Sequence, residues 1–250
     1  MIESSGLGSM TTAPRLNGKG SSWKLWDRIA AKKLGLGNPF SFDDHVNESK
    51  WESFTVTFQD SVFFELMEKF SRNRAGTGAL VTFKDSSWLM SIVLAFQPHF
   101  RNQPVHVKVF WGYGLYPDRI GDFVKKKMCD CTGEEIMAEL LYHLHFEEHK
   151  EAIMATANCI PCMMPYITSQ FMPRLGSDRP KVVPEGSTNL AFIGQFCEIP
   201  DDVVFTEEYS VRAARIAVYT LFGIDKPIAP INQYQYDVRT LLSSLVTSFR

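Results

Sequence analysis

The chain has 250 residues, of which 45% are hydrophobic and 13% aromatic, so it can bury a sizeable core as one large domain or two small ones. Its formal net charge of -2 gives no electrostatic basis for binding nucleic acid. Five cysteines, no secretory apolar segment at the start and no run of about 18 apolar residues favour a cytoplasmic protein with free thiols.

The start of the chain divides into a polar segment and an aromatic one. Residues 1–22 are rich in Ser, Gly and Thr and have no periodic apolar positions, which predicts a disordered tail. From Trp23 to Gly37 the pattern predicts a short amphipathic helix with Trp23, Trp26 and Ile29 on one face. We expect this aromatic face to point into a core rather than to a membrane surface.

The next part of the chain predicts a block of strands followed by helices, which is typical of an α+β lobe. Alternating apolar residues indicate a strand over 54–58, and Asp60 follows as the N-cap of a helix. Thr132 and Glu135 form a capping box ahead of a helix from about 133 to 145. The helix after Asp60 carries Phe63, Phe64, Met67 and Phe70, and a meander of strands is expected over 79–83, 89–94 and 105–111.

Residues 153–174 combine three prolines with four of the ten methionines of the chain. Because proline disfavours long helices and central strands, this composition predicts an irregular apolar wall. Such a wall, with a few small polar groups, suits a pocket for a long flexible apolar ligand with one polar end. A plain hydrophobic core loop is the alternative.

Residues 189–215 predict a strand, a turn and a helix. The apolar run from Leu190 to Ile193 is followed by Gly194, an acidic turn and a helix that opens at Tyr209 or Ser210. A glycine that lets a backbone approach closely and a helix N-terminus can together hold an anionic cofactor group. An ordinary buried strand, turn and helix of an α/β domain is the alternative. The helix is expected to present Val211, Ala214, Val218 and Leu221 on one face.

The cysteines and histidines do not form a recognised motif. Cys159 and Cys162 form a C-x-x-C and Cys129 and Cys131 form a C-x-C, but the second pair cannot supply a normal zinc knuckle. Free thiols are therefore favoured, and no metal site is assigned. The histidines and serines lie in no known catalytic motif, so no catalytic residue is assigned either.

Several long strings resemble the carboxy-terminal part of the oleate hydratases, the flavoenzymes first named myosin-cross-reactive antigens. The resemblance covers nearly everything from Trp23 to the end of the chain. It implies an FAD-dependent enzyme that adds water to the cis-9 double bond of oleic acid to give 10-hydroxystearic acid, with a mainly structural and electrostatic flavin. The strings are WESFTVTF (51–58), AGTGALVTFKDSSWLMSIVL (75–94), FWGYGLYPDRIGDFVKKKM (110–128), CTGEEIMAELLYHL (131–144), CIPCMMPYITSQFMPR (159–174), DRPKVVPEGSTNLAFIGQFCEIPDDVVFTEEYSVRAARIAVYTLFG (178–223) and INQYQYDVR (231–239).

The resemblance also implies site residues. Thr156 and Asn158 correspond to the TAN string that binds the fatty acid carboxylate, and neutral donors can do so without adding a second charge to an apolar tunnel. Cys162 stands where some members have a histidine, and it is included in the substrate set. The implied flavin contacts are Gly194, Gln195, Phe196, Thr206 and Ser210.

The family's G-x-G-x-x-G fingerprint and its catalytic residues belong to an amino-terminal half, and no such glycine pattern occurs in this chain. We therefore expect a fragment that holds one wall of the flavin site and one wall of the fatty acid tunnel. A catalytically inactive lipid-binding or interaction remnant is the alternative. The expected partners are oleate or linoleate, a second copy of the chain and a peripheral membrane contact, without nucleic acid.

The expected fold class is α/β in the sense of mixed α+β, with a partial Rossmann-like FAD-binding element beside an α+β substrate-binding lobe. The expected division is a disordered tail (1–22), a substrate-binding lobe (23–188), a returning strand, turn and helix of the FAD-binding domain (189–223) and a carboxy-terminal segment (224–250).

Overall fold

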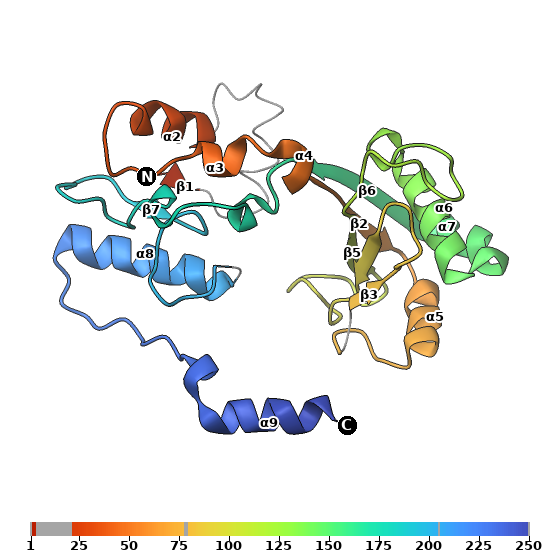
Figure 1. Ribbon diagram of the computed structural model, residues 1–250. Helices are drawn as coiled ribbons and strands as arrows, with labels where there is room; N and C mark the ends of the chain where they lie inside the picture. Colours follow the sequence, from red (N-terminus) through yellow and green to blue (C-terminus); the bar gives the residue numbers. More distant parts are fainter. Residues whose placement is uncertain (1, 4–21, 78–79, 205, 250) are drawn as a thin grey trace. The chain divides into compact units, whose positions relative to one another are not determined.

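The computed structural model describes residues 2–3, 22–77, 80–204 and 206–249, and it divides into two compact units (Figure 1). We call Val46–Thr168 the sheet unit, and Met1–His45 together with Ser169–Arg250 the terminal unit. Most of the predicted tail over 1–22 lies outside the described residues. The functional division drawn from the sequence stays a prediction.

The sheet unit is built on a five-stranded antiparallel sheet in the order β3-β4-β5-β2-β6. The predicted meander is confirmed, because β3, β4 and β5 are neighbours in chain order. The strands are β2 (Trp51–Phe58), β3 (Leu80–Thr82), β4 (Met90–Val93), β5 (Lys108–Gly114) and β6 (Ala157–Met164). The helices are α4 (Val46–Ser49), α5 (Val62–Ser71), α6 (Gly133–Leu144) and α7 (Lys150–Thr156), with short 3-10 turns η1 (Met128–Asp130) and η2 (Glu147–His149).

One core joins the sheet to α5, α6 and α7, which lie on the same side of it in Figure 1. The alternation in β2 places Phe54, Val56 and Phe58 on this side, and all three are fully buried. Phe63 of α5 stacks on Phe58 and on Phe110, with ring centroids 4.9 Å apart in both pairs. The capping box of α6 is present as predicted, since Thr132 Oγ1 accepts from Glu135 N and Glu135 Oε2 accepts from Thr132 N.

The prediction of an irregular wall over 153–174 is wrong for its central part. Residues Ala157–Met164 form a regular strand that pairs with β2 along its whole length, and Pro161 lies opposite Phe54. The strand tolerates a proline because β6 is at the edge of the sheet, where one row of backbone groups has no neighbouring strand to bond. Pro161 is therefore compatible with an edge strand, although it would disrupt a central one.

The terminal unit is built mainly of helices and short turns. Strand β7 (Phe192–Ile193) pairs in parallel with β1 (Ile2–Glu3). Trp26 of α2 is buried as predicted, and its Nε1 donates to the Leu36 carbonyl at 2.6 Å. The remaining elements are α2 (Ser22–Ala30), α3 (Phe40–Asp43), η3 (Ser169–Phe171), η4 (Gly176–Asp178), α8 (Glu207–Phe222), η5 (Tyr234–Tyr236) and α9 (Val238–Ser248).

Helix α8 begins at Glu207 and buries a different face from the one that the sequence suggested. The buried positions are Tyr209, Ala213 and Ala217, which are spaced four residues apart, together with Arg212. Val211 and Val218 are exposed instead. The small alanines let the helix approach its neighbours closely. In the sequence, they indicated a buried face less strongly than the more hydrophobic valines did. No helix among the described residues is long and apolar enough to cross a membrane.

Gly133 shows how closely α6 approaches the edge strand. A Cβ atom added there would lie 1.9 Å from the carbonyl oxygen of Cys159, which belongs to the backbone and cannot rotate away. We predict that Gly133→Ala lowers the free energy of unfolding by about 3 kcal/mol or more, measured by chemical denaturation. Gly176→Ala is the control, because nothing lies within 4 Å of its added Cβ. Equal stability of the two variants would contradict this packing.

Candidate functional site

The side of the sheet opposite the core carries most of the substrate residues implied by the sequence. Directly paired residues on neighbouring antiparallel strands point to the same side. Asn158 pairs with Thr57 and Cys162 pairs with Ser53, so both point away from the side that holds Phe54. We define the open face as the surface formed by Trp51, Thr55, Trp111, Tyr113, Asn158, Ile160 and Cys162.

The open face is aromatic and partly exposed to solvent. Trp51 stacks on Tyr113 with ring centroids 4.4 Å apart, and Trp111 lies 5.6 Å from the same tyrosine. Trp111 is 39% exposed and Ile160 is 59% exposed. Exposed aromatic and aliphatic side chains of this kind can bind an apolar ligand or another protein segment.

Thr156 lies beside this face but its hydroxyl group already has a partner. It is the last residue of α7, and its Oγ1 donates to Asp60 Oδ2 at 3.0 Å. The other Asp60 oxygen accepts from the Val62 N–H at the start of α5. A ligand carboxylate that reaches Thr156 would therefore be repelled by the negative charge of Asp60. Asn158, on the strand that follows α7, is exposed.

The two cysteines of the C-x-x-C lie on β6, three residues apart, and therefore point to opposite sides of the sheet. Cys159 packs against the core, and burial raises its pKa to about 12. Two sulfurs on opposite sides of one strand cannot bind the same ion, which agrees with the interpretation as free thiols.

The flavin residues implied by the sequence lie in the terminal unit. Gly194 has a φ of 93°, a left-handed conformation that favours glycine. The turn after it is held by buried side chains, since the Gln195 carbonyl accepts from Arg179 at 2.8 Å. Phe196 is buried and packs edge-on against Phe42, with ring centroids 5.4 Å apart. The Phe196 side chain is therefore part of the core of this unit.

The first turn of α8 combines a cap with two carboxylates. Thr206 is the N-cap, accepting from the Tyr209 N–H and donating to the Val203 carbonyl. Glu207 and Glu208 follow in the first turn, and their negative charges already complement the positive end of the helix dipole. Ser210 is half-buried one residue after Tyr209. This helix end is consequently a poor site for a diphosphate, although it can accept an uncharged polar group.

Glu52 is a titratable residue that the sequence interpretation missed. It lies on β2 on the same side as Phe54 and Val56, and it is only 5% exposed. Burial raises the pKa of its carboxyl from 4.5 to about 7. A glutamate in phase with the buried residues of an alternating strand was the available signal.

A second missed group comprises Asp122, Glu139 and His143, whose ligand atoms all lie within 4.8 Å of one another. Glu139 is fully buried and accepts from the N–H groups of Asp122, Phe123 and Val124 at 2.5, 2.9 and 2.7 Å. A cleft of about 480 Å³ lies next to the group. It is lined by Thr82, Phe83, Lys84, Asp85, Asp122, Tyr142, His143 and His145.

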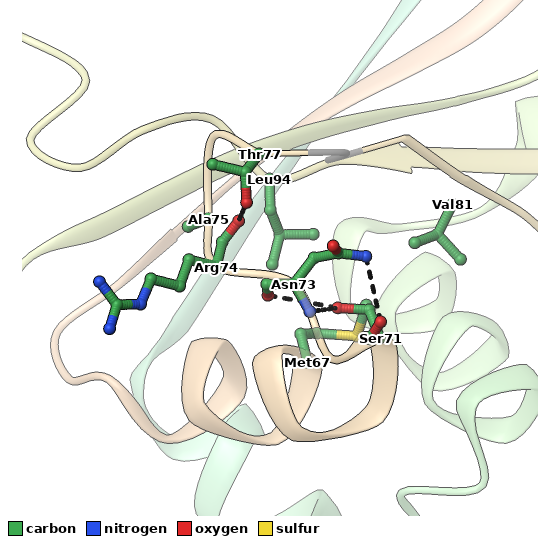
Figure 2. A pocket seen from close by; sticks show the side chains of 8 residues that line it. All are labelled: Met67, Ser71, Asn73, Arg74, Ala75, Thr77, Val81 and Leu94. Carbon is green, nitrogen blue, oxygen red and sulfur yellow. Dashed lines mark hydrogen bonds between the residues drawn. The ribbon is translucent and has the colours of Figure 1, made fainter.

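A much smaller pocket lies between the end of α5 and the strands β3 and β4 (Figure 2). Its volume is about 10 Å³, which is enough for one water molecule and too small for an acyl chain. Figure 2 shows that Asn73 and Ser71 form hydrogen bonds with each other beside Met67. These hydrogen bonds stabilise the turn that follows α5. None of the substrate residues implied by the sequence lines this pocket or the larger cleft.

Comparison with known proteins gives one family and two informative relatives. The family model described as the MCRA family matches residues 1–219. The oleate hydratase of Streptococcus pyogenes serotype M49 (strain NZ131) is 42% identical over 235 residues, which is 90% of this chain and 40% of that protein. The linoleate hydratase of Lactiplantibacillus plantarum is 35% identical over an alignment of 258 residues, which is 96% of this chain and 45% of that protein. The chain therefore spans less than half the length of these two relatives.

The raised pKa of Glu52 predicts a pH dependence of stability. In the folded chain the carboxyl keeps its proton up to about pH 7, whereas the unfolded value is 4.5, so the stabilisation is complete below about pH 4.5 and is lost as the pH rises through 7. We predict that Glu52→Gln, which cannot ionise, is more stable than the original chain at about pH 8 by a few kcal/mol and loses this advantage at about pH 4. Urea denaturation at both pH values measures the difference.

The exposed Glu151 offers a matched control for this experiment. Glu151→Gln should shift stability little at either pH, because a solvated carboxylate gains little by losing its charge. If Glu52→Gln behaves like this control, the Glu52 carboxyl is not buried in the way that the structure shows.

Proposed function

Because the chain belongs to the MCRA family, we propose that it acts in the hydration of long-chain unsaturated fatty acids such as oleate and linoleate. The observation that carries this proposal is the 42% identity to an oleate hydratase across 90% of the chain. The reaction class is that of a hydro-lyase, in which a double bond receives a proton on one carbon and a hydroxyl group on the other.

We propose that the open face forms one wall of the fatty acid site. Its aromatic and aliphatic side chains can cover a long acyl chain, and Asn158 at its margin offers an uncharged donor to the carboxylate. Thr156 is expected to contribute less, since its Oγ1 already donates to Asp60 Oδ2 at 3.0 Å. Cys162 lies four residues beyond Asn158 on β6, so it would contact the acyl chain rather than the carboxylate.

We further propose that the terminal unit contacts FAD, the cofactor of the oleate hydratase family. The positive φ of Gly194 and the polar side chains at Thr206 and Ser210 suit a flavin group that accepts or donates hydrogen bonds. Glu207 and Glu208 disfavour the diphosphate there, so we assign an uncharged part of the cofactor to this helix end. Bound FAD would supply structural and electrostatic support without net redox chemistry.

Exposed apolar surface supports a requirement for a further protein segment. Val211, Val218 and Phe222 form an exposed apolar stripe along α8, where Phe222 is 77% exposed. We propose that this stripe and the open face pack against the amino-terminal part that the longer relatives possess. On this proposal the glycine-rich FAD fingerprint and the catalytic acid and base come from that part.

Helix α9 supports a peripheral membrane contact as a further part of the proposal. Its apolar residues are exposed, and no charged residue follows Arg239 within the helix. A homodimer stays a prediction. The exposed apolar residues are Val238, Leu241, Leu242, Leu245 and Val246.

The assignment of Asn158 to the carboxylate generates a binding prediction. Loss of a hydrogen bond to a charged group should weaken oleate binding by roughly ten- to a hundredfold in Asn158→Ala, measured by calorimetric titration below the micelle concentration. Asn102→Ala is the control, since Asn102 is an exposed asparagine on a turn between β4 and β5. Equal affinity of Asn158→Ala and the original chain would remove Asn158 from the site.

The same titration tests the role of Asp60. If the carboxylate approaches Thr156, then Asp60→Asn removes a like charge and should tighten binding several-fold. Weaker binding in Asp60→Asn would indicate that Asp60 only supports the end of α7 through Thr156.

The proposed cooperation between the two parts predicts the outcome of reconstitution. The chain alone should neither retain FAD nor convert oleate, and addition of the amino-terminal part of the Streptococcus pyogenes relative should restore both. Ser210→Asp should lower flavin retention in this mixture, because it removes the hydroxyl group proposed to bond the flavin and adds a negative charge beside Glu207 and Glu208. Ser243→Asp, on the exposed face of α9, is the matched control.

Two outcomes of this experiment would change the proposal. A yellow preparation of this chain that forms 10-hydroxystearate unaided would place the catalytic residues within these 250 residues. Oleate binding without activity in any mixture would favour the inactive lipid-binding alternative.

A further inference from the structure

Asp122, Glu139 and His143 bring three metal-ligating side chains together at a place that the proposed function does not use. Helix α6 supplies Glu139 and His143, one helical turn apart, and the loop after β5 supplies Asp122. His143 Nε2 lies 3.3 Å from Asp122 Oδ2 and 3.4 Å from Glu139 Oε1. One imidazole nitrogen and two carboxylate oxygens therefore converge on one point.

The imidazole nitrogen at the centre of the group lacks a hydrogen bond. The His143 side chain is only 10% exposed, and its Nε2 is buried without a hydrogen-bond partner among the described residues. Both carboxylates lie within hydrogen-bonding distance of His143 Nε2, but the directions of these contacts do not suit hydrogen bonds. A buried polar atom without a partner is costly, and a cation bound between the three groups would supply the missing interaction.

The two distances from His143 Nε2 match the ligand spacing around a tetrahedral metal ion, and all three ligand atoms lie within 4.8 Å of one another. Zinc binds histidine nitrogen and carboxylate oxygen at about 2.0–2.2 Å, so two ligands of one tetrahedral ion lie roughly 3.3–3.6 Å apart. The two distances from His143 Nε2, 3.3 and 3.4 Å, fall in this range. We infer that Asp122, Glu139 and His143 form a binding site for a divalent transition metal ion of the zinc type.

The surroundings hold the two carboxylates in place. Three backbone N–H groups fix Glu139, and the Ser87 N–H and Oγ donate to Asp122 at 2.7 and 2.5 Å. Such outer contacts orient metal ligands.

The fourth coordination position would face the cleft. Asp122 and His143 both line that cleft, whereas Glu139 lies behind them in the core. A metal with three protein ligands and one position open to solvent binds water or a small anion there. The metal site does not rest on the proposed hydratase function, and its test requires no turnover.

The competing interpretation is that a protonated His143 forms ion pairs with the two carboxylates and binds nothing. To decide, the purified chain is stripped with a chelator and titrated with Co²⁺ and Zn²⁺ by calorimetry and absorption spectroscopy. We expect one equivalent of Co²⁺ with d–d bands and without the intense near-ultraviolet band of cobalt thiolates, which separates this site from the cysteines. Zn²⁺ should displace Co²⁺ and raise the melting temperature.

Variants identify the ligands. His143→Gln and Asp122→Asn should each weaken metal binding at least about tenfold and abolish the rise in melting temperature. His145→Asn is the matched control, because His145 lines the same cleft outside the group, and asparagine tolerates its φ of 57°. Circular dichroism checks that each variant folds. If His143→Gln does not fold, Asp122→Asn alone tests the site.

Two results would overturn the metal site. The first is the absence of Co²⁺ and Zn²⁺ binding to the original chain. The second is unchanged binding in a folded His143→Gln or Asp122→Asn variant, which would place the metal elsewhere. A loss in these variants that His145→Asn does not share supports the site, whatever the outcome of the oleate experiments.

Discussion

The sheet unit depends on the pairing of β2 with a neighbour on each side. All eight residues of Trp51–Phe58 have partners in β6, and seven have partners in β5. This double pairing fixes which residues point to each side, because a shift by one residue would exchange the two sides. Phe54, Val56 and Phe58 then fill the core, and the alternate residues contribute to the open face. The position of Asn158 and Cys162 follows from the same register.

One buried ionisable side chain in each unit bonds to backbone groups. Glu139 in the sheet unit accepts three N–H groups, and Arg179 in the terminal unit donates to the carbonyl groups of Gln195 and Gln170. Tyr209 completes the second arrangement, since its hydroxyl donates to the Cys197 carbonyl and accepts from the Ile199 N–H. These interactions stabilise irregular loops that have few hydrogen bonds of their own. The turn after Gly194 is held in this way.

Local signals in the sequence predicted the elements whose causes are local. The capping box at Thr132, the alternation over 54–58 and the meander are all present, because each depends on residues that are close in the chain. The strand through Pro161 could not be foreseen, since it depends on being at the edge of a sheet assembled from distant segments. The buried face of α8 was missed because Ala213 and Ala217 are small, and the packing partner decides which side is covered.

The candidate sites show the same limit. The C-x-x-C of Cys159 and Cys162 is a motif by spacing, but a strand directs its two sulfurs to opposite sides. Asp122, in contrast, is 17 positions from Glu139 and follows no motif with it, yet the hydrogen bond at 2.5 Å joins the two. Residues of known chemistry could be found in the sequence, whereas their convergence depends on tertiary structure.

The close contact of Gly133 with the Cys159 carbonyl bears on strand addition at the β6 edge of the sheet. An edge strand can template the addition of a strand from another molecule, which leads to aggregation. On β6, Pro161 has no N–H to offer an incoming strand, and the first turn of α6 crowds the carbonyl group two residues earlier. Any added strand would therefore meet a gap and an obstruction within the span of three residues. The β6 edge of the sheet is protected from strand addition by its own sequence, although the open face remains available for binding.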